Sequence, residues 1–102
     1  MNPFLLTVLY KEPGCAPEVK QISNSIAEME ELVHGKIDSV GVDDGICVIC
    51  NSMAELLKMP LCTEIYNQKF YGPILMVEFN ENGQLCSLDE DNIQYYAKLF
   101  HE

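Results

Sequence analysis

The chain has 102 residues, a length typical of a single domain spanning residues 1–102, and 48% of them are apolar. That is enough to build a core without disulfides or metals, and it argues against disorder. Sixteen Asp and Glu face six Lys and no Arg, giving a formal charge of −10. Because Lys and Arg contacts to phosphate drive nucleic-acid binding, this balance argues against nucleic acid and anionic membranes as partners and favours a basic protein.

The five cysteines are odd in number and scattered along the chain, which is typical of a reducing compartment. Residues 1–10 include a short apolar run but no basic start and no cleavage-site pattern, so they do not resemble an export signal. No run approaches the roughly 18 apolar residues of a membrane span. We therefore expect a cytoplasmic protein with no membrane partner.

Taken in chain order, the strand patterns begin at residues 4–10, which are apolar on both alternating faces and predict a central strand. Residues 19–22 alternate poorly and predict an edge strand. Two hairpins follow from turn chemistry between β-rich runs, since Asp-Gly and Asn-Gly are the strongest short hairpin signals. The first joins residues 36–42 to 46–50 through Asp44-Gly45, and the second joins 74–79 to 84–86 through Asn82-Gly83.

Three helix starts carry the capping-box pattern, a Ser followed three residues later by Glu: Ser25–Glu28, Ser52–Glu55 and Ser87–Glu90. Apolar residues at helical spacing follow each one. The first stripe is Ile26, Met29, Leu32 and Val33, the second Met53, Leu56 and Leu57, and the third Ile93, Tyr96, Ala97 and Phe100. The predicted fold is α+β, a mixed or antiparallel sheet of five to six strands with about three helices packed mainly on one face.

Cys47 and Cys50 form a C-x-x-C pattern, which invites a redox or zinc interpretation. The spacer, however, lies inside a β-rich run, where residues three apart point to opposite faces about 10 Å apart. That spacing is too long for a disulfide. Two core cysteines are the favoured interpretation, and the other Cys and His complete no familiar zinc spacing, so we expect no metal.

No catalytic arrangement is evident, because nucleophilic catalysis needs a nucleophile with a positioned base. His34 lies at a predicted helix end and His101 next to the C-terminus. The carboxylates gather at turns and first helical turns, where Asp and Glu are favoured for backbone reasons. We expect no enzyme activity and no cofactor.

Residues 61–73 form the only long stretch without a periodic pattern, and long irregular loops are often functional. Tyr66, Phe70 and Tyr71 could stack on a ligand ring or anchor a partner, with Lys69 beside them. Alternatively, these aromatics cover a sheet edge or enter the core. Asn51, at a predicted strand end, is the fifth candidate binding residue.

Several segments together resemble a bacterial family of small proteins classed as a domain of unknown function. They are PEVKQI (17–22), DDGICVICN (43–51), LKMP (57–60), GPILMV (72–77) and SLDEDN (87–92). The resemblance implies a setting in phages and conjugative elements of Gram-positive bacteria, not a mechanism. Family members usually carry acidic residues after the Asn that matches Asn51, where this chain has Ser52 and Met53. They also carry Asn-Arg where it has Leu61 and Cys62.

Two functions stay open at this level. The first is a non-catalytic protein-interaction or host-modulating accessory factor of a phage or mobile element, in one version mimicking the charge of DNA. The second is a small-ligand, nucleotide-like binding module that uses residues 61–73. Tyr95 and Leu99, which widen the last helical stripe, suggest a homodimer face.

Overall fold

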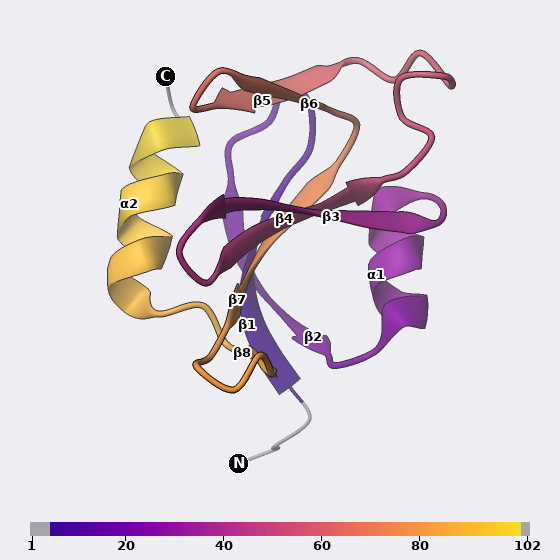
Figure 1. Ribbon diagram of the computed structural model, residues 1–102. Coiled ribbons are helices and arrows are strands. Elements are labelled where there is room, and N and C mark those ends of the chain that lie inside the picture. Colours follow the sequence, from indigo (N-terminus) through magenta and orange to yellow (C-terminus); the bar gives the residue numbers. More distant parts are fainter. Residues whose placement is uncertain (1–4, 101–102) are drawn as a thin grey trace.

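The computed structural model describes residues 5–100 and shows an α+β domain (Figure 1). In chain order its elements are β1 (Leu5–Lys11), β2 (Glu18–Ser23), α1 (Ile26–Val33), β3 (Ile37–Asp43), β4 (Ile46–Asn51), β5 (Leu61–Ile65), β6 (Gln68–Tyr71), β7 (Ile74–Phe79), β8 (Leu85–Cys86) and α2 (Glu90–Phe100). Six strands form one sheet in the order β2-β1-β7-β4-β3, with β8 also paired to β7, and β5 and β6 form a second sheet. All of these pairings are antiparallel.

The middle of the main sheet is formed by β7 and β1, whose side chains are buried on both faces. Ile74 to Val77 of β7 are completely buried. In β1, Val8 belongs to one apolar cluster and Leu9 to the cluster on the opposite face. This confirms the predicted strand buried on both sides, although Phe4 lies outside the described residues. Among the strands of residues 5–100, β2 pairs only with β1 and is an edge strand, as predicted.

Both hairpins predicted from turn chemistry are present. Gly45 and Gly83 adopt φ values of 76° and 75°, the left-handed conformation that glycine adopts without steric cost. The first turn joins β3 to β4, and the second joins β7 to the two-residue β8. Local turn chemistry therefore fixes the register of these strand pairs.

Helix α1 begins and ends where the sequence predicts. Ser25 is the N-cap, and its Oγ accepts a hydrogen bond from the Glu28 N–H at 3.3 Å. The reciprocal bond of the capping box differs, because the Glu28 carboxylate accepts from the Ser23 N–H instead (2.8 Å). The helix ends at His34, whose φ is 67°. Met29 is buried as predicted, whereas Ile26 is 63% exposed.

The third capping box does not form. The Ser87 Oγ instead accepts a hydrogen bond from the Thr7 N–H (2.9 Å), and the Leu88 N–H donates to the Thr7 carbonyl (2.8 Å). This segment is thereby docked on β1, and α2 begins only at Glu90. The pattern predicted the helix but placed its N-cap too early. The Ser87 Oγ accepts from a backbone N–H of β1 rather than from a backbone N–H of α2.

The two helices lie on opposite faces of the sheet, so the prediction that helices pack mainly on one face is wrong (Figure 1). Met29 of α1 belongs to the apolar cluster that contains Leu6 and Ile22. Tyr96 and Phe100 of α2 belong to the other cluster. Because the central strands present apolar side chains to both faces, each face needs its own cover.

The predicted helix at Ser52 is also wrong, and the described residues contain two helices rather than about three. Residues 52–58, hereafter the turn segment, form successive turns with mixed hydrogen-bond spacing. Lys58 adopts a φ of 56°, and Pro60 prevents continuation. Leu56 and Leu57 are 75% and 59% exposed, so the stripe has no core to pack against. A helix this short gains its stability from such packing.

Residues 61–73 are not an irregular loop but hold the β5–β6 hairpin. Tyr66 and Asn67 form its two-residue turn with φ values of 49° and 71°, as a type I′ turn requires. Ile65 and Phe70 are buried in the same cluster as α2. The buried Lys11 amine fastens the hairpin to the main sheet by donating to the Cys62 carbonyl (3.1 Å). The hairpin escaped prediction because its turn contains Tyr where Asn or Gly is usual.

Cys47 and Cys50 lie on a strand as expected, and the predicted two core cysteines are partly buried side chains packed against the core. Cys47 packs with the α1-side cluster and Cys50 with the α2-side cluster, so their side chains leave β4 on opposite faces. Both are unpaired thiols. Within residues 5–100, no helix combines the length and apolarity needed to cross a bilayer.

Candidate functional site

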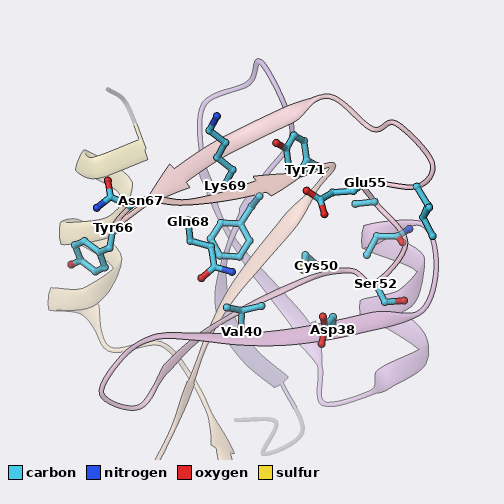
Figure 2. A pocket seen from close by; sticks show the side chains of 14 residues that line it. Asp38, Val40, Cys50, Ser52, Glu55, Tyr66, Asn67, Gln68, Lys69 and Tyr71 are labelled. Carbon is cyan, nitrogen blue, oxygen red and sulfur yellow. The ribbon is translucent and has the colours of Figure 1, made fainter.

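The five candidate binding residues all line one cleft of about 800 Å³. The cleft lies between the β5–β6 hairpin on one side and β3, the end of β4 and the turn segment on the other (Figure 2). The structure therefore brings together residues that the sequence separates by up to 20 positions, from Asn51 to Tyr71. They do not, however, all present a functional group to the cleft.

Asn51 is buried, and its amide is engaged within the protein. Its Nδ2 donates to the carbonyls of Val33 and His34, both at 3.1 Å, and its Oδ1 accepts from the Met53 N–H at 2.8 Å. A Cβ on Gly35 would lie 2.8 Å from the same Nδ2, so glycine there leaves room for the amide. Asn51 thus joins the end of α1 to the start of the turn segment and shapes the cleft rather than offering a free donor.

The residues of β6 alternate in direction, as strand geometry demands. Phe70 is buried among the core residues and forms part of the cleft floor. Figure 2 shows the Lys69 amine pointing away from the cleft and Gln68 pointing into the space towards Val40. Tyr71 is partly exposed at the cleft margin. Of the two predicted aromatic residues on β6, Phe70 is buried and Tyr71 is therefore the one accessible to a ligand.

Tyr66 occupies the hairpin turn and directs its hydroxyl towards α2. That hydroxyl donates to the Asp43 Oδ2 (3.1 Å) and shares a hydrogen bond with the Tyr95 hydroxyl (2.8 Å). The Tyr96 hydroxyl donates to the same carboxylate oxygen. The bond to Tyr95, then burial and the bond to Asp43, raise the pKa of Tyr66 to about 12. The hairpin turn, the β3–β4 turn and α2 are thereby held together.

Comparison with known proteins adds the family. The family described as Domain of unknown function (DUF3846) matches residues 6–101. This chain belongs to it. The resemblance seen in the sequence is confirmed at that level, and the phage and Gram-positive setting stays a prediction. No curated protein and no solved structure matches the chain.

Two carboxylates of this DUF3846 domain, Asp38 and Glu55, line the cleft and were not among the predicted site residues. Asp38 leaves β3 on the same face as Val40, and its Oδ1 accepts from the Ser39 N–H at 3.0 Å. Among residues 5–100, ion pairs within 4 Å join only Lys20 to Glu18 and Lys36 to Glu30. Within this described part of the chain, neither cleft carboxylate lies within 4 Å of a cationic nitrogen, although Lys69 belongs to the same cleft lining. Nothing in the sequence distinguishes them from the other fourteen acids, since only the tertiary structure brings them to one cleft.

Two buried or partly buried thiols, Cys50 and Cys62, have pKa values above the ordinary value for cysteine. Burial, and next the Asp38 carboxylate, raises the pKa of the Cys50 thiol at the cleft. Burial also raises the pKa of Cys62 to about 11, and its thiol donates to the Lys11 carbonyl. Thiolate is the reactive form, so raised pKa values oppose nucleophilic chemistry at neutral pH. Residues 5–100 contain no group of three His, Cys, Asp or Glu able to hold a metal, and His101 lies outside them.

Proposed function

We propose that this domain is a non-catalytic protein-interaction module that binds a basic partner at the cleft. The observation that carries the proposal is that two carboxylates, Asp38 and Glu55, line the cleft and neither forms an ion pair within 4 Å in the described part of the chain. A partner Lys or Arg entering the cleft beside either carboxylate would form charge-assisted hydrogen bonds with it. The cleft walls supply the remaining contact area.

Exposed apolar side chains next to these carboxylates support a macromolecular partner. Met53, Leu56 and Leu57 of the turn segment and Leu61 of β5 are each at least 47% exposed, and Leu56 also lines the cleft. Large apolar residues gathered on a soluble surface are typical of interaction sites. An apolar centre with a charged margin is also the usual anatomy of a protein interface.

The net charge of −10 favours the same class of partner. Complementary charge accelerates association and selects against acidic competitors, and salt weakens both effects. In the mobile-element setting that the resemblance implies, the partner would be a host or element-encoded protein, and the domain would act as an accessory factor that modulates it.

The small-ligand alternative has one observation in its favour, the volume of the cleft. A volume of about 800 Å³ lies within the roughly 300–1,000 Å³ range of small-molecule sites. A nucleotide-like ligand, however, would place its phosphates near Asp38 and Glu55, and the chain has no Arg with which to hold them. The carboxylates therefore favour a cationic protein segment over a nucleotide.

The proposal is tested by affinity capture from host lysate, identification of the captured protein and titration of that protein in purified form. We expect saturable binding that Leu56→Asp weakens at least tenfold, because the change places a charge in the apolar contact. Val19→Asp is the matched control, since Val19 is 56% exposed on β2 at the other edge of the sheet. Equal effects of the two changes would contradict the site. A nucleotide panel that raises the melting temperature, together with no saturable protein partner, would favour the ligand alternative.

A further inference from the structure

The outer edge of the main sheet at β3 is unpaired. β3 is the last strand in the order β2-β1-β7-β4-β3, and its only strand partner among residues 5–100 is β4. It borders the cleft, because Asp38 and Val40 supply one wall (Figure 2). An unpaired strand edge is a template for main-chain hydrogen bonding with another chain.

The register identifies the backbone groups that face outward. The Ser52 N–H donates to the Lys36 carbonyl (2.8 Å), and the pairing continues with Ile37 opposite Asn51. In an antiparallel ladder hydrogen-bonded pairs recur at every second residue, so Asp38 and Val40 bond to β4. The N–H and C=O groups of the residues between them, at positions 37, 39 and 41, therefore point away from the sheet.

One of these outward N–H groups, that of Ser39, already donates a hydrogen bond to the Asp38 carboxylate. Its Oδ1 accepts from the Ser39 N–H at 3.0 Å, and both residues are exposed. Acidic or basic side chains on an edge strand commonly protect it from unwanted pairing. A cationic side chain near Asp38 would compete for this carboxylate and release the Ser39 N–H, so the protection is sensitive to the charge of the incoming chain.

The two faces beside the β3 edge differ in chemistry. Asp38 and Val40 face the cleft that also holds Glu55. Ile37 and Ser39 face a second cleft of about 440 Å³ beneath α1. Its other lining residues are predominantly apolar: Asn24, Ile26, Met29, Ile49, Phe79 and Leu85. A strand added at this edge would send alternate side chains over an acidic face and an apolar face.

We propose that the partner adds an extended segment to the β3 edge, and that this segment alternates basic and apolar residues. Its basic side chains lie over the Asp38 and Glu55 cleft, and its apolar side chains lie over the cleft beneath α1. The inference rests on the proposed function and specifies the partner's conformation and sequence pattern. A second copy of this chain fits the edge poorly, because its own β3 carries Asp38 and Asp43 and each chain carries a charge of −10.

The experiment uses an end-capped peptide of alternating lysine and valine, labelled for fluorescence anisotropy and titrated with the full chain. Residues opposite Ile37, Ser39 and Gly41 share their face, so the valines are the residues whose amides bond to β3. We expect methylation of the valine backbone nitrogens to weaken binding about tenfold or more. Methylation of the lysine backbone nitrogens should change it less than about twofold, since those amides face solvent.

A peptide of the same composition with its lysines and valines in separate blocks controls for charge alone and should bind about tenfold more weakly than the alternating one. On the protein side, Ser39→Pro removes an outward donor without removing a bond to β4, and Ser39→Ala retains it. We expect only the proline variant to lose binding, with an unchanged melting temperature confirming its fold. Equal effects of the two methylation patterns, or equal binding of the two peptides, would overturn strand addition.

The two proposals fail separately. If a purified partner binds saturably and is sensitive to Leu56→Asp but not to Ser39→Pro, the interaction function stands and strand addition is wrong. If the alternating peptide binds at β3 while no protein partner is found, the edge is competent but the proposed function loses its support.

Discussion

At the end of β4, the Asn51 side chain joins the end of α1 to the start of the turn segment by donating to Val33 and His34 and accepting from Met53. The residue is 4% exposed, so water cannot replace these bonds if the amide is removed. A buried group left without its partner costs more free energy than a satisfied bond gains. The same bonds fix the start of the turn segment and hence one wall of the cleft.

We therefore expect Asn51→Ala to lower the free energy of unfolding by about 2–4 kcal/mol, because three backbone groups lose their partner together. Urea denaturation monitored by circular dichroism measures the change. Gln68→Ala is the control, since Gln68 is exposed and should cost less than about 0.5 kcal/mol. A loss for Asn51→Ala no greater than that of the control would show that the amide is dispensable.

The hydroxyl of Tyr66 gives a prediction for pH. Its pKa is about 12 in the folded protein and 10.0 as a reference, so the folded state holds this proton more tightly than the unfolded state. The corresponding stabilisation is complete below pH 10 and is lost as pH rises towards 12. Burial and the Asp43 bond also raise the pKa of Tyr96, and burial and Glu12 raise that of Tyr10 to about 12.

Melting temperatures measured from pH 8 to pH 12 check this prediction. We expect wild type to lose stability above pH 10 and Tyr66→Phe to lose less of it over the same interval, because the variant has one fewer proton to release. Lysine titration affects both proteins equally and cancels in the comparison. Parallel curves for wild type and variant would mean that the Tyr66 hydroxyl is not coupled to folding.

Among the elements, the β5–β6 hairpin is the one whose turn sequence fits its conformation least well. Tyr66 and Asn67 both adopt positive φ, where side chains other than those of Gly and Asn are disfavoured. The bonds from Tyr66 to Asp43 and Tyr95 compensate for this conformation. The hairpin position over the sheet thus depends on contacts outside the hairpin itself.

Substitutions at Asn67 test this conformation directly. Asn67→Gly should be neutral or raise the free energy of unfolding by about 0.5 kcal/mol, since glycine is favoured at the second position of a type I′ turn. Asn67→Val should lower it by about 1–2 kcal/mol, because a β-branched residue is strained at positive φ. Thermal unfolding of both variants gives the comparison. A valine variant as stable as the glycine variant would contradict the turn type.

For the turn segment we expect that substitutions of its exposed residues leave the stability of the protein almost unchanged. The exposed leucines of this segment contribute little to the core, so Leu57→Asp should change the free energy of unfolding by less than about 0.5 kcal/mol. The buried neighbour Ala54 is the contrast, because Ala54→Asp would place a charge among packed residues and cost several kcal/mol. Chemical denaturation of both variants measures the two changes in the free energy of unfolding. A large loss for Leu57→Asp would mean that the exposed leucines of the turn segment contribute to the core.

For the whole molecule, the dominant property is the charge of −10 on 102 residues. Like charges repel one another in the compact state, and salt screens this repulsion within about 10 Å at 0.1 M. We expect the melting temperature to rise when sodium chloride is increased from about 0.01 to 0.3 M, and affinity for a basic partner to fall over the same range. Scanning calorimetry and titration at matched salt check the two effects, which should have opposite signs.

Much of the fold was predictable because its signals are local. The buried central strand, the Asp44-Gly45 and Asn82-Gly83 hairpins and the limits of α1 all follow from residues adjacent in the chain. The errors have two causes, which are competition from a distant group and the lack of a surface to pack against. Ser87 bonds to Thr7 rather than capping α2. The stripe after Ser52 has no surface to pack on, and its first turn is organised by Asn51.

The candidate residues show the same division. Sequence reasoning selected five residues that do line one cleft, because aromatic and amide side chains near strand ends stand out from their neighbours. It missed Asp38 and Glu55, because no sequence pattern distinguishes these two among the sixteen acidic residues of the chain. It also could not show that Asn51 is engaged internally or that Lys69 points away from the cleft.

The sequence alone determined the family, the α+β class, the net charge and the opposite orientations of Cys47 and Cys50. These properties depend on composition, on turn residues and on the two-residue period of strands, all of which act over short distances in the chain. The tertiary structure alone decided which face each helix covers, where the β5–β6 hairpin lies and which carboxylates line the cleft beside the β3 edge. Those features depend on packing between segments that are far apart in the chain. The free energy of such packing cannot be read from the pattern of neighbouring residues.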